Sequence, residues 1–351
     1  MSLAFIPTVE TAGLAAMHIA HFGEEVLSVA AMKGDASDRR IFRLRGAAQS
    51  SIGILGPNIA ENRAFTGFAR GFRGAGLRVP EIYAISEDDR SYLEEDLGDM
   101  TLAGWQAALP EAARGGEMRV MYTQVLGELL RFQVDAADTV DYSLCYQTPE
   151  FGAEAMAFDI RYFRENFLER LVVRSWNAPA FERETSGLIE LLLRADRSSF
   201  LYRDFQSRNV MVRDGLPWFI DFQSGRLGAL HYDVAALLYD SRGNISEVER
   251  MLLVSRYCDM LEERQPLNRG EFLYLFHGFA VLRLLQALGA FGNLGLNKGK
   301  PDFLTLIPSR LEALGELLRS AEIMHALPEL RSLLLSISDD PTTISIPTVI
   351  P

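Results

Sequence analysis

The fold of this chain is decided by two neighbouring segments: residues 201–209, Leu-Tyr-Arg-Asp-Phe-Gln-Ser-Arg-Asn, and residues 219–225, Phe-Ile-Asp-Phe-Gln-Ser-Gly. The residues between them have the pattern of two short strands joined by an Asp-Gly pair at 214–215. Asp-Gly between two strand-like runs is a strong signal for a tight hairpin turn. We therefore predict a β-hairpin that returns Asp221 to the side of Asn209.

The polar residues of this hairpin have the types and spacing of a phosphoryl-transfer site. Asp204 and Asn209 are five residues apart, the separation between a catalytic base and a metal-binding amide in kinase catalytic loops. A phosphoryl group in transfer carries negative charge, and Mg²⁺ takes hard oxygen ligands. We predict that Asn209 and Asp221 bind Mg²⁺ against ATP or GTP, and that Asp204 accepts or orients the proton of an acceptor hydroxyl.

Each part of this pattern also has an ordinary explanation. A single Asp and Asn at this spacing occurs in solvated loops, and Asp221 taken alone could simply end a strand. The combination is more specific, because loop, hairpin and second Asp follow in order and are followed by Tyr232-Asp233.

These motifs resemble the aminoglycoside phosphotransferase and choline kinase superfamily, whose members have a protein-kinase-like fold and phosphorylate small molecules. The resemblance covers about residues 24–320 and is carried by residues 34–43, 92–99, 202–209, 220–223 and 232–238. Residues 283–291 and 300–304 further resemble a bacterial branch of amino-sugar kinases that phosphorylate N-acetylmuramate and N-acetylglucosamine at the anomeric hydroxyl.

The resemblance implies roles for residues outside the hairpin. Residues 34–43 would form the loop that covers the nucleotide, and backbone groups near Glu95 and Leu97 would read adenine at a hinge, although this segment could also be a plain strand end. Asp233 would accept hydrogen bonds from the catalytic-loop backbone, or cap the helix that follows it, or both.

The predicted third strand, residues 51–56, departs from the protein-kinase pattern because it carries no Lys. The partner of that Lys would be Glu61 by position, but Glu61 also completes a capping box that begins at Asn58. We predict that the missing phosphate-facing charge comes from the glycine- and serine-containing loop around Ser37, where the candidate cations are Lys33, Arg39, Arg40 and Arg43.

The acceptor site is predicted only by the resemblance. Asp159 and Glu165 lie on a helix predicted over residues 158–171, and Arg283 and Gln286 lie on a later helix. Polar residues on helices more often form a solvated face. Because cationic acceptors need concentrated carboxylates or an aromatic cage, this mixture of charges favours a neutral or anionic sugar over an aminoglycoside or an aminoalcohol such as choline.

Composition restricts the class of protein. The 351 residues are 48% hydrophobic and carry a net charge of −12, which argues against a nucleic-acid partner. Cys145 and Cys258 are too few and too distant for a disulfide framework or a zinc site. We find no run of 18 uncharged apolar residues and no signal peptide, and we expect a cytoplasmic protein with no membrane partner.

The order of predicted elements indicates an α+β, bilobal protein-kinase-like fold. A leading helix over residues 8–22 precedes a small β-sheet lobe with one helix that begins near Asn58, and a larger, mainly helical lobe follows. We divide the chain into an N-terminal nucleotide-binding lobe (1–97), a C-terminal catalytic and acceptor-binding lobe (98–335) and a tail (336–351). The predicted strands are residues 26–31, 40–45, 51–55, 79–85 and 91–96.

Two classes of function remain open from the sequence. The first is a small-molecule kinase that transfers the γ-phosphate of ATP to a hydroxyl, and the second is a nucleotide-binding pseudokinase that acts as a regulatory module. Pseudokinases usually lose one of the three polar residues, and Asp204, Asn209 and Asp221 are all present, which favours the enzyme. The sequence predicts neither the acceptor nor the oligomeric state.

Overall fold

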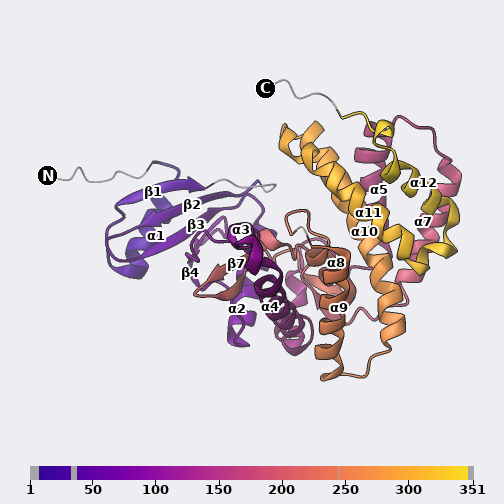
Figure 1. The fold of residues 1–351 in the computed structure, drawn as a ribbon. Helices are drawn as coiled ribbons and strands as arrows, with labels where there is room; N and C mark the ends of the chain where they lie inside the picture. Colours follow the sequence, from indigo (N-terminus) through magenta and orange to yellow (C-terminus); the bar gives the residue numbers. More distant parts are fainter. Residues whose placement is uncertain (1–7, 33–37, 244, 347–351) are drawn as a thin grey trace.

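The computed structural model describes residues 8–32, 38–243 and 245–346. Figure 1 shows a sheet-containing N-terminal lobe beside a larger helical lobe. This is the bilobal, protein-kinase-like architecture that the order of the elements predicted.

The N-terminal lobe is built on one antiparallel sheet with the strand order β1-β2-β3-β5-β4. Each face of this sheet buries its own helix, because the side chains of a strand alternate between faces. Leu44 and Leu93 pack with Leu14 of α1, whereas Ile54 and Tyr92 join the core formed by Phe65 of α2. The elements are α1 (Ala12–Phe22), β1 (Ser28–Met32), β2 (Arg40–Arg45), β3 (Ser50–Leu55), α2 (Ile59–Gly74), β4 (Ile82–Ile85) and β5 (Ser91–Glu95).

Two boundaries in this lobe differ from the prediction by three residues or more, and the other strand ends differ by two residues at most. The leading helix begins at Ala12 rather than at residue 8, because the carbonyl of Thr8 accepts hydrogen bonds from Thr11 and Ala12 in a separate turn. It ends where predicted, at Gly23, which has a φ of 71°. β4 begins at Ile82 rather than at residue 79, and the run before it contains Pro80, which has no N–H to give to a ladder.

The C-terminal lobe packs its helices around α10, which is in contact with α5, α8 and α11. α10 is long and apolar enough to cross a membrane, but 78% of its apolar window is buried inside the protein. The helices of this lobe are α3 (Leu102–Ala108), α4 (Glu111–Leu130), α5 (Ala153–Phe163), α6 (Glu169–Leu171), α7 (Ala178–Leu192), α8 (Leu230–Leu238), α9 (Glu247–Glu262), α10 (Arg269–Leu296), α11 (Ile307–Ser320) and α12 (Pro328–Asp339).

The helix predicted over residues 158–171 is longer and less regular than expected. It begins at Ala153 as α5, passes through a π-helical turn at Arg164–Leu168, and ends with α6. The segment assigned to the tail also has structure, because α12 extends to Asp339. Beyond it, Ser345 donates a backbone hydrogen bond to Leu171, and Ile344 bridges to Val172.

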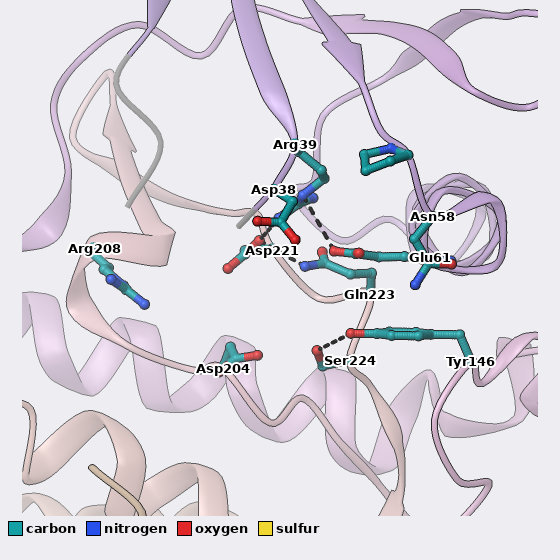
Figure 2. Close-up of a pocket in the computed structure, with 11 residues that line it drawn as sticks. Asp38, Arg39, Asn58, Glu61, Tyr146, Asp204, Arg208, Asp221, Gln223 and Ser224 are labelled. Carbon is teal, nitrogen blue, oxygen red and sulfur yellow. Dashed lines mark hydrogen bonds and ion pairs between the residues drawn. The ribbon is translucent and has the colours of Figure 1, made fainter. Parts of the chain in front are cut away.

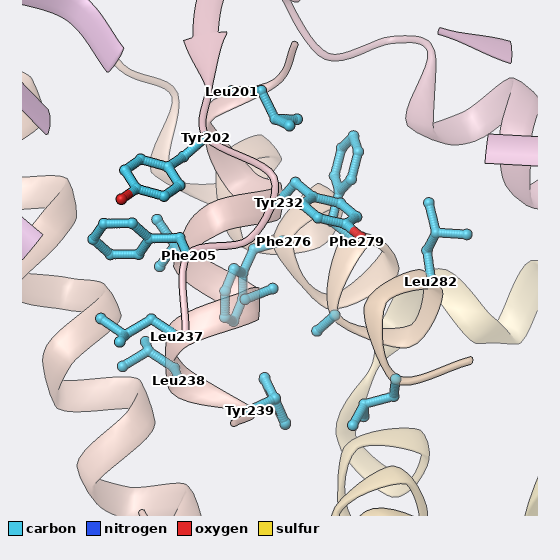
Figure 3. Packing of buried hydrophobic residues seen from close by; sticks show 14 of the residues in the cluster. Leu201, Tyr202, Phe205, Tyr232, Leu237, Leu238, Tyr239, Phe276, Phe279 and Leu282 are labelled. Atoms are coloured by element: carbon cyan, nitrogen blue, oxygen red, sulfur yellow. The ribbon is translucent and has the colours of Figure 1, made fainter. Parts of the chain in front are cut away.

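Two small antiparallel pairs carry the catalytic segment. β7 (Val210–Arg213) and β8 (Leu216–Phe219) form the predicted hairpin, and β6 (Ser199–Leu201) pairs with β9 (Arg226–Gly228). Asp214 and Gly215 both have positive φ, which a hairpin turn of this kind requires. Figure 3 shows Tyr202 and Phe205 of this segment on the apolar packing that α8 and α10 provide.

The hairpin also connects the two lobes on the hinge side. The N–H of Phe219 donates to the carbonyl of Arg78 at 2.9 Å, and the Arg78 side chain donates to the carbonyl of Pro217 at 2.9 Å. Arg213 forms an ion pair with Glu95 at 2.7 Å. We call these contacts the hinge seam.

Candidate functional site

The backbone before Asp204 is held by Asp233 on α8. The two carboxylate oxygens of Asp233 accept hydrogen bonds from the N–H groups of Tyr202 at 2.7 Å and Arg203 at 2.9 Å. Gln133 donates to the same carboxylate at 3.2 Å. Burial raises the pKa of Asp233 to about 7, although the three donors act in the opposite direction.

Arg203 adds a second anchor next to Asp204. Its guanidinium donates to both oxygens of Asp159, at 2.7 and 2.8 Å, and lies between the rings of Phe151 and Tyr232 at 4.8 and 4.9 Å. Its backbone has a φ of 80°, a strained value for a residue with a side chain. Strain of this kind persists only where the surroundings impose it, so the position of Asp204 is strongly constrained.

The hairpin brings Asp221 next to Asn209, as predicted. The amide of Asn209 donates to the carbonyl of Asp204 at 2.8 Å and to Asp221 at 3.1 Å. Asp221 has a φ of 70°, and the Phe222 ring that follows it stacks on Phe65 of α2 at 4.7 Å. The three polar residues of the prediction therefore belong to one connected site.

The oxygens of this site suit a hard divalent cation. Asp221 offers a carboxylate, and the hydrogen bonds made by the Asn209 amide nitrogen orient its carbonyl oxygen. Among the described residues there is no group of three or more His, Cys, Asp or Glu side chains that would hold a metal by itself. Mg²⁺ is commonly held by one or two protein ligands together with phosphate oxygens and waters, and Asp221 and Asn209 are oxygen ligands of that kind.

Arg39, directly before β2, lies between two carboxylates of the site (Figure 2). It forms an ion pair with Asp221 and a second one, at 3.4 Å, with Glu61 of α2. Burial would lower the pKa of Arg39, but Asp221, Tyr92 and Glu61 raise it overall, so the charge is retained. Arg39 thereby makes a contact with Glu61 like the one that a Lys on the third strand makes in protein kinases, and its role toward phosphate stays a prediction.

The same contacts separate the two interpretations of Glu61. Asn58 caps α2 by accepting hydrogen bonds from the N–H groups of Ala60 and Glu61. The carboxylate of Glu61 faces Arg39, so its backbone serves the cap while its side chain belongs to the site. Burial raises the pKa of Glu61, and Arg39 opposes this rise.

The other predicted phosphate-facing cations lie elsewhere. Arg40 points outward, with 62% of its side chain exposed, and pairs with Glu10. Arg43 is buried and contacts the hinge, where it pairs with Asp96 at 2.9 Å and with Asp99 at 2.7 Å. Lys33 and Ser37 lie outside the described residues, so their roles stay predictions.

Asp204, Asp221, Arg39 and Glu61 line a cavity of about 370 Å³. Figure 2 shows that Tyr146 and Ser224 also border it, and the sequence analysis assigned no role to either. Ser224 could have been found from the sequence, because it lies only three residues after Asp221 in the same motif. Tyr146 could not, because it comes from a loop without hydrophobic periodicity.

The predicted acceptor and hinge residues are dispersed. Glu165 is exposed and pairs with Arg164, and Arg283 and Gln286 are hydrogen-bonded to each other on α10. Leu97 is buried, while the Glu95 side chain contacts Arg213 and Arg73. The structure does not place Asp159, Glu165, Arg283 or Gln286 on the wall of the cavity, and their roles in acceptor binding stay predictions.

Comparisons with known proteins give a consistent result. The Phosphotransferase enzyme family matches residues 31–267. The N-acetylmuramate/N-acetylglucosamine kinase of Pseudomonas aeruginosa is 26% identical over 310 residues, which cover 84% of this chain and 87% of that protein. The protein of the same name from Neisseria meningitidis is 27% identical over 68% of this chain and 70% of its own length.

Similarity to solved structures supports the fold. The choline/ethanolamine kinase family protein from Mesorhizobium loti superimposes with a TM-score of 0.61 and 14% identity, over 92% of this chain and 97% of that one. At 14% identity, this similarity shows a shared fold and gives no information about the acceptor substrate.

Proposed function

Because this chain belongs to the phosphotransferase enzyme family, we propose that it transfers the γ-phosphate of ATP to a hydroxyl of an amino sugar. The observation that carries the proposal is the single site formed by Asp204, Asn209 and Asp221, with Arg39 beside it. The names of the curated relatives support a sugar of the N-acetylmuramate or N-acetylglucosamine type. A cytoplasmic location fits such a kinase.

Each residue of the site has a defined task in this reaction. Asp204 accepts or orients the proton of the acceptor hydroxyl, and the anchors at Asp233 and Arg203 hold the backbone that leads into it. Arg39 directs positive charge to the phosphates, and Glu61 orients Arg39. Asn209 and Asp221 are the residues that would hold Mg²⁺. When bound, Mg²⁺ would neutralise the charge that develops on the phosphate oxygens.

An aminoalcohol acceptor is less well supported by the contacts. A quaternary or primary ammonium needs free carboxylates or an aromatic cage. Asp159, the buried carboxylate that the sequence offered on the acceptor side, has both oxygens paired with Arg203. Breaking that buried pair would leave Arg203 without its partner, at a cost of about 3–5 kcal/mol.

A pseudokinase function is also disfavoured. A nucleotide-binding module without turnover does not require a base at the position of Asp204. In this protein Asp204 borders the same cavity as Asp221 and Arg39, and its backbone is fixed from two sides.

The experiment is an ADP-release assay with Mg-ATP and a panel of N-acetylglucosamine, N-acetylmuramate, simple hexoses, choline and kanamycin. We expect the N-acetylated amino sugars to give the highest kcat/KM, with phosphorus NMR identifying the phosphorylated hydroxyl. The control is Asp204→Asn, which should give no acceptor-dependent ADP. Preferential use of choline or kanamycin, or no turnover with any acceptor, would contradict the proposal.

A further inference from the structure

The cavity beside Asp204 has two chemically different ends. Arg39, Asp221 and Glu61 form a charged end that suits phosphate and a cation. Tyr146 and Ser224 border the cavity below Glu61 and Gln223, and Asp204 lies on the other side of Ser224 from Tyr146 (Figure 2). Since the reaction is a transfer between two ligands, the end that lacks the phosphate-binding charge is the place for the acceptor. This assignment rests on the proposed function.

Tyr146 is held in a fixed orientation at this end. Its hydroxyl lies 3.3 Å from the Ser224 hydroxyl and accepts a hydrogen bond from the Gln147 amide at 3.0 Å. Figure 2 shows the ring extending from the edge of the cavity toward Ser224, with Glu61 and Gln223 on one side of it. The side chain is only partly buried, so part of the ring is open to the cavity.

Arg226 supports this arrangement from below the surface. Its buried guanidinium donates to the carbonyl of Ser224 at 3.0 Å, to the hydroxyl of Thr148 at 2.9 Å, and to the side-chain oxygen of Gln147. Among the described residues, no carboxylate forms an ion pair with Arg226. Burying a charge with only neutral acceptors is costly, and burial together with Arg203 lowers the pKa of Arg226. Through these three hydrogen bonds Arg226 ties Ser224 to the 146–148 loop.

We propose that Tyr146 is the platform of the acceptor subsite, on which the apolar face of a pyranose ring stacks while one ring hydroxyl is presented to Asp204. A pyranose has C–H groups on its faces and hydroxyls around its edge, so it matches an aromatic face bordered by polar groups. Ser224, Gln223 and Asp204 are among the polar groups at this border, and the cavity of about 370 Å³ has room for one sugar ring.

Arg226 acts as a positioning residue in this proposal. It does not touch the acceptor. It fixes Gln147 and Ser224, the two residues that hold the Tyr146 hydroxyl. Loss of Arg226 should therefore weaken acceptor binding, as loss of the Tyr146 ring does. The cause differs, because the ring would still be present but would be held less firmly.

The test compares three substitutions at one position with a matched control, using steady-state kinetics with the best amino sugar of the panel. Tyr146→Leu removes the aromatic face and should raise the acceptor KM about tenfold, the equivalent of one stacking contact, with the ATP KM unchanged. Tyr146→Phe and Tyr146→Trp keep an aromatic face but lose the hydroxyl that Ser224 and Gln147 hold, so their acceptor KM should rise less than that of Tyr146→Leu. Tyr142→Leu is the control, because Tyr142 lies in the same segment and donates to the carbonyl of Ala137.

The outcomes separate this inference from the proposed function. If the wild-type protein phosphorylates no sugar, the proposed function fails and the platform fails with it. If the wild type turns over an amino sugar and Tyr146→Leu, with an unchanged melting temperature, has the wild-type acceptor KM, the platform alone is overturned. The platform would also be overturned if Tyr146→Leu raised the acceptor and ATP KM values equally, or if Tyr142→Leu raised the acceptor KM as much as Tyr146→Leu does. A general loosening of the lobe predicts either result.

A second measurement tests the role of Arg226. Arg226→Gln keeps hydrogen-bonding capacity but removes the charge and the fork geometry. The acceptor KM should rise, and a double variant with Tyr146→Leu should be no worse than Tyr146→Leu alone, because both changes remove the same contact. Additive effects of the two substitutions would reject the positioning role.

Discussion

The guanidinium of Arg39, at the edge of β2, forms an ion pair with the carboxylate of Glu61 on α2, 22 residues further along the chain. In protein kinases this carboxylate pairs with a Lys on the third strand. Here the third strand carries only Ser, Ile, Gly and Leu, and the positive charge next to Glu61 is that of Arg39, the residue directly before the neighbouring strand β2. A guanidinium also differs from an ammonium, since its planar fork can bind two acceptors at once, and Arg39 contacts Asp221 as well.

Arg39→Ala should weaken ATP binding much more than adenosine binding. Only ATP presents phosphate charge to the guanidinium, and loss of one partly buried charge-assisted contact costs about 1.5–3 kcal/mol, or about ten- to a hundredfold in Kd. Calorimetry with both ligands measures the difference. Arg40→Ala is the matched control, because Arg40 is the adjacent arginine and points outward. Equal effects of the two substitutions would exclude Arg39 as the phosphate contact.

Asp204→Asn should abolish turnover while Mg-nucleotide binding is preserved. The amide is nearly isosteric with the carboxylate but cannot accept the acceptor proton as a base. The Arg203 and Asp233 anchors involve the backbone and the neighbouring side chain, so the loop should keep its conformation. Single-turnover measurements and nucleotide titration give the two quantities. A variant with turnover near that of the wild type would mean that another group is the base.

Asp221→Ala and Asn209→Ala should both lose activity, but only the second should be rescued by metal. Removing the Asp221 carboxylate takes away the single charged ligand, whereas Asn209 contributes one neutral oxygen. We therefore expect high Mg²⁺ to restore part of the activity of Asn209→Ala and none of that of Asp221→Ala. Activity measured as a function of Mg²⁺ concentration distinguishes them. An Asp221→Ala variant that retains activity would place the metal elsewhere.

His231→Phe should stabilise the protein and reduce its sensitivity to acid. His231 is stacked between Phe272 and Phe279, and within the described part of the chain neither of its ring nitrogens has a hydrogen-bond partner. Phe would fill the same space without buried unsatisfied nitrogens, a gain of about 1 kcal/mol. Urea denaturation at pH 7 measures this difference in the free energy of unfolding.

The pH dependence follows from the same residue. Burial lowers the pKa of His231 to about 3, below its value of 6.5 in an unfolded chain. Between about pH 6.5 and pH 3 the unfolded chain binds a proton at this histidine and the folded protein does not. The free energy of unfolding should therefore fall by about 1.4 kcal/mol per pH unit in this range, and this residue should not change it above about pH 6.5. In His231→Phe this part of the decline should be absent, whereas His325→Gln, a change at an exposed histidine, should leave it in place. Identical acid profiles for the wild type and His231→Phe would contradict the assignment.

Features written in local sequence were predictable. The hairpin was predicted because Asp-Gly and the flanking strand residues determine its turn, and α2 because Phe65, Phe68 and Phe72 recur at helical spacing. Local sequence patterns predicted the ends of helices and strands less well than their existence. The turn before α1 resembles a helix start because Thr8 and Thr11 are both good capping residues, and the two hydroxyls bond to each other there.

Features that depend on distant contacts were not predictable. Arg39 and Asp221 are 182 residues apart, so sequence could name four cations around the loop but could not say which of them faces the site. Tyr146 had no signal at all, because a residue in an irregular loop belongs to a cavity only through the packing of other segments. Asp159 is the opposite case, since a helical carboxylate that looked available is paired with Arg203.

The hinge seam has a consequence for how ligands enter and leave. A kinase-like enzyme must admit two substrates and release two products, which usually requires the lobes to separate. Contacts from Arg78 to Pro217 and from Arg213 to Glu95 hold the lobes together along one border. Separation is then a rotation about that border, and because Phe65 and Phe72 of α2 pack on Phe222, α2 should stay with the C-terminal lobe while the strands of the sheet rotate away from it.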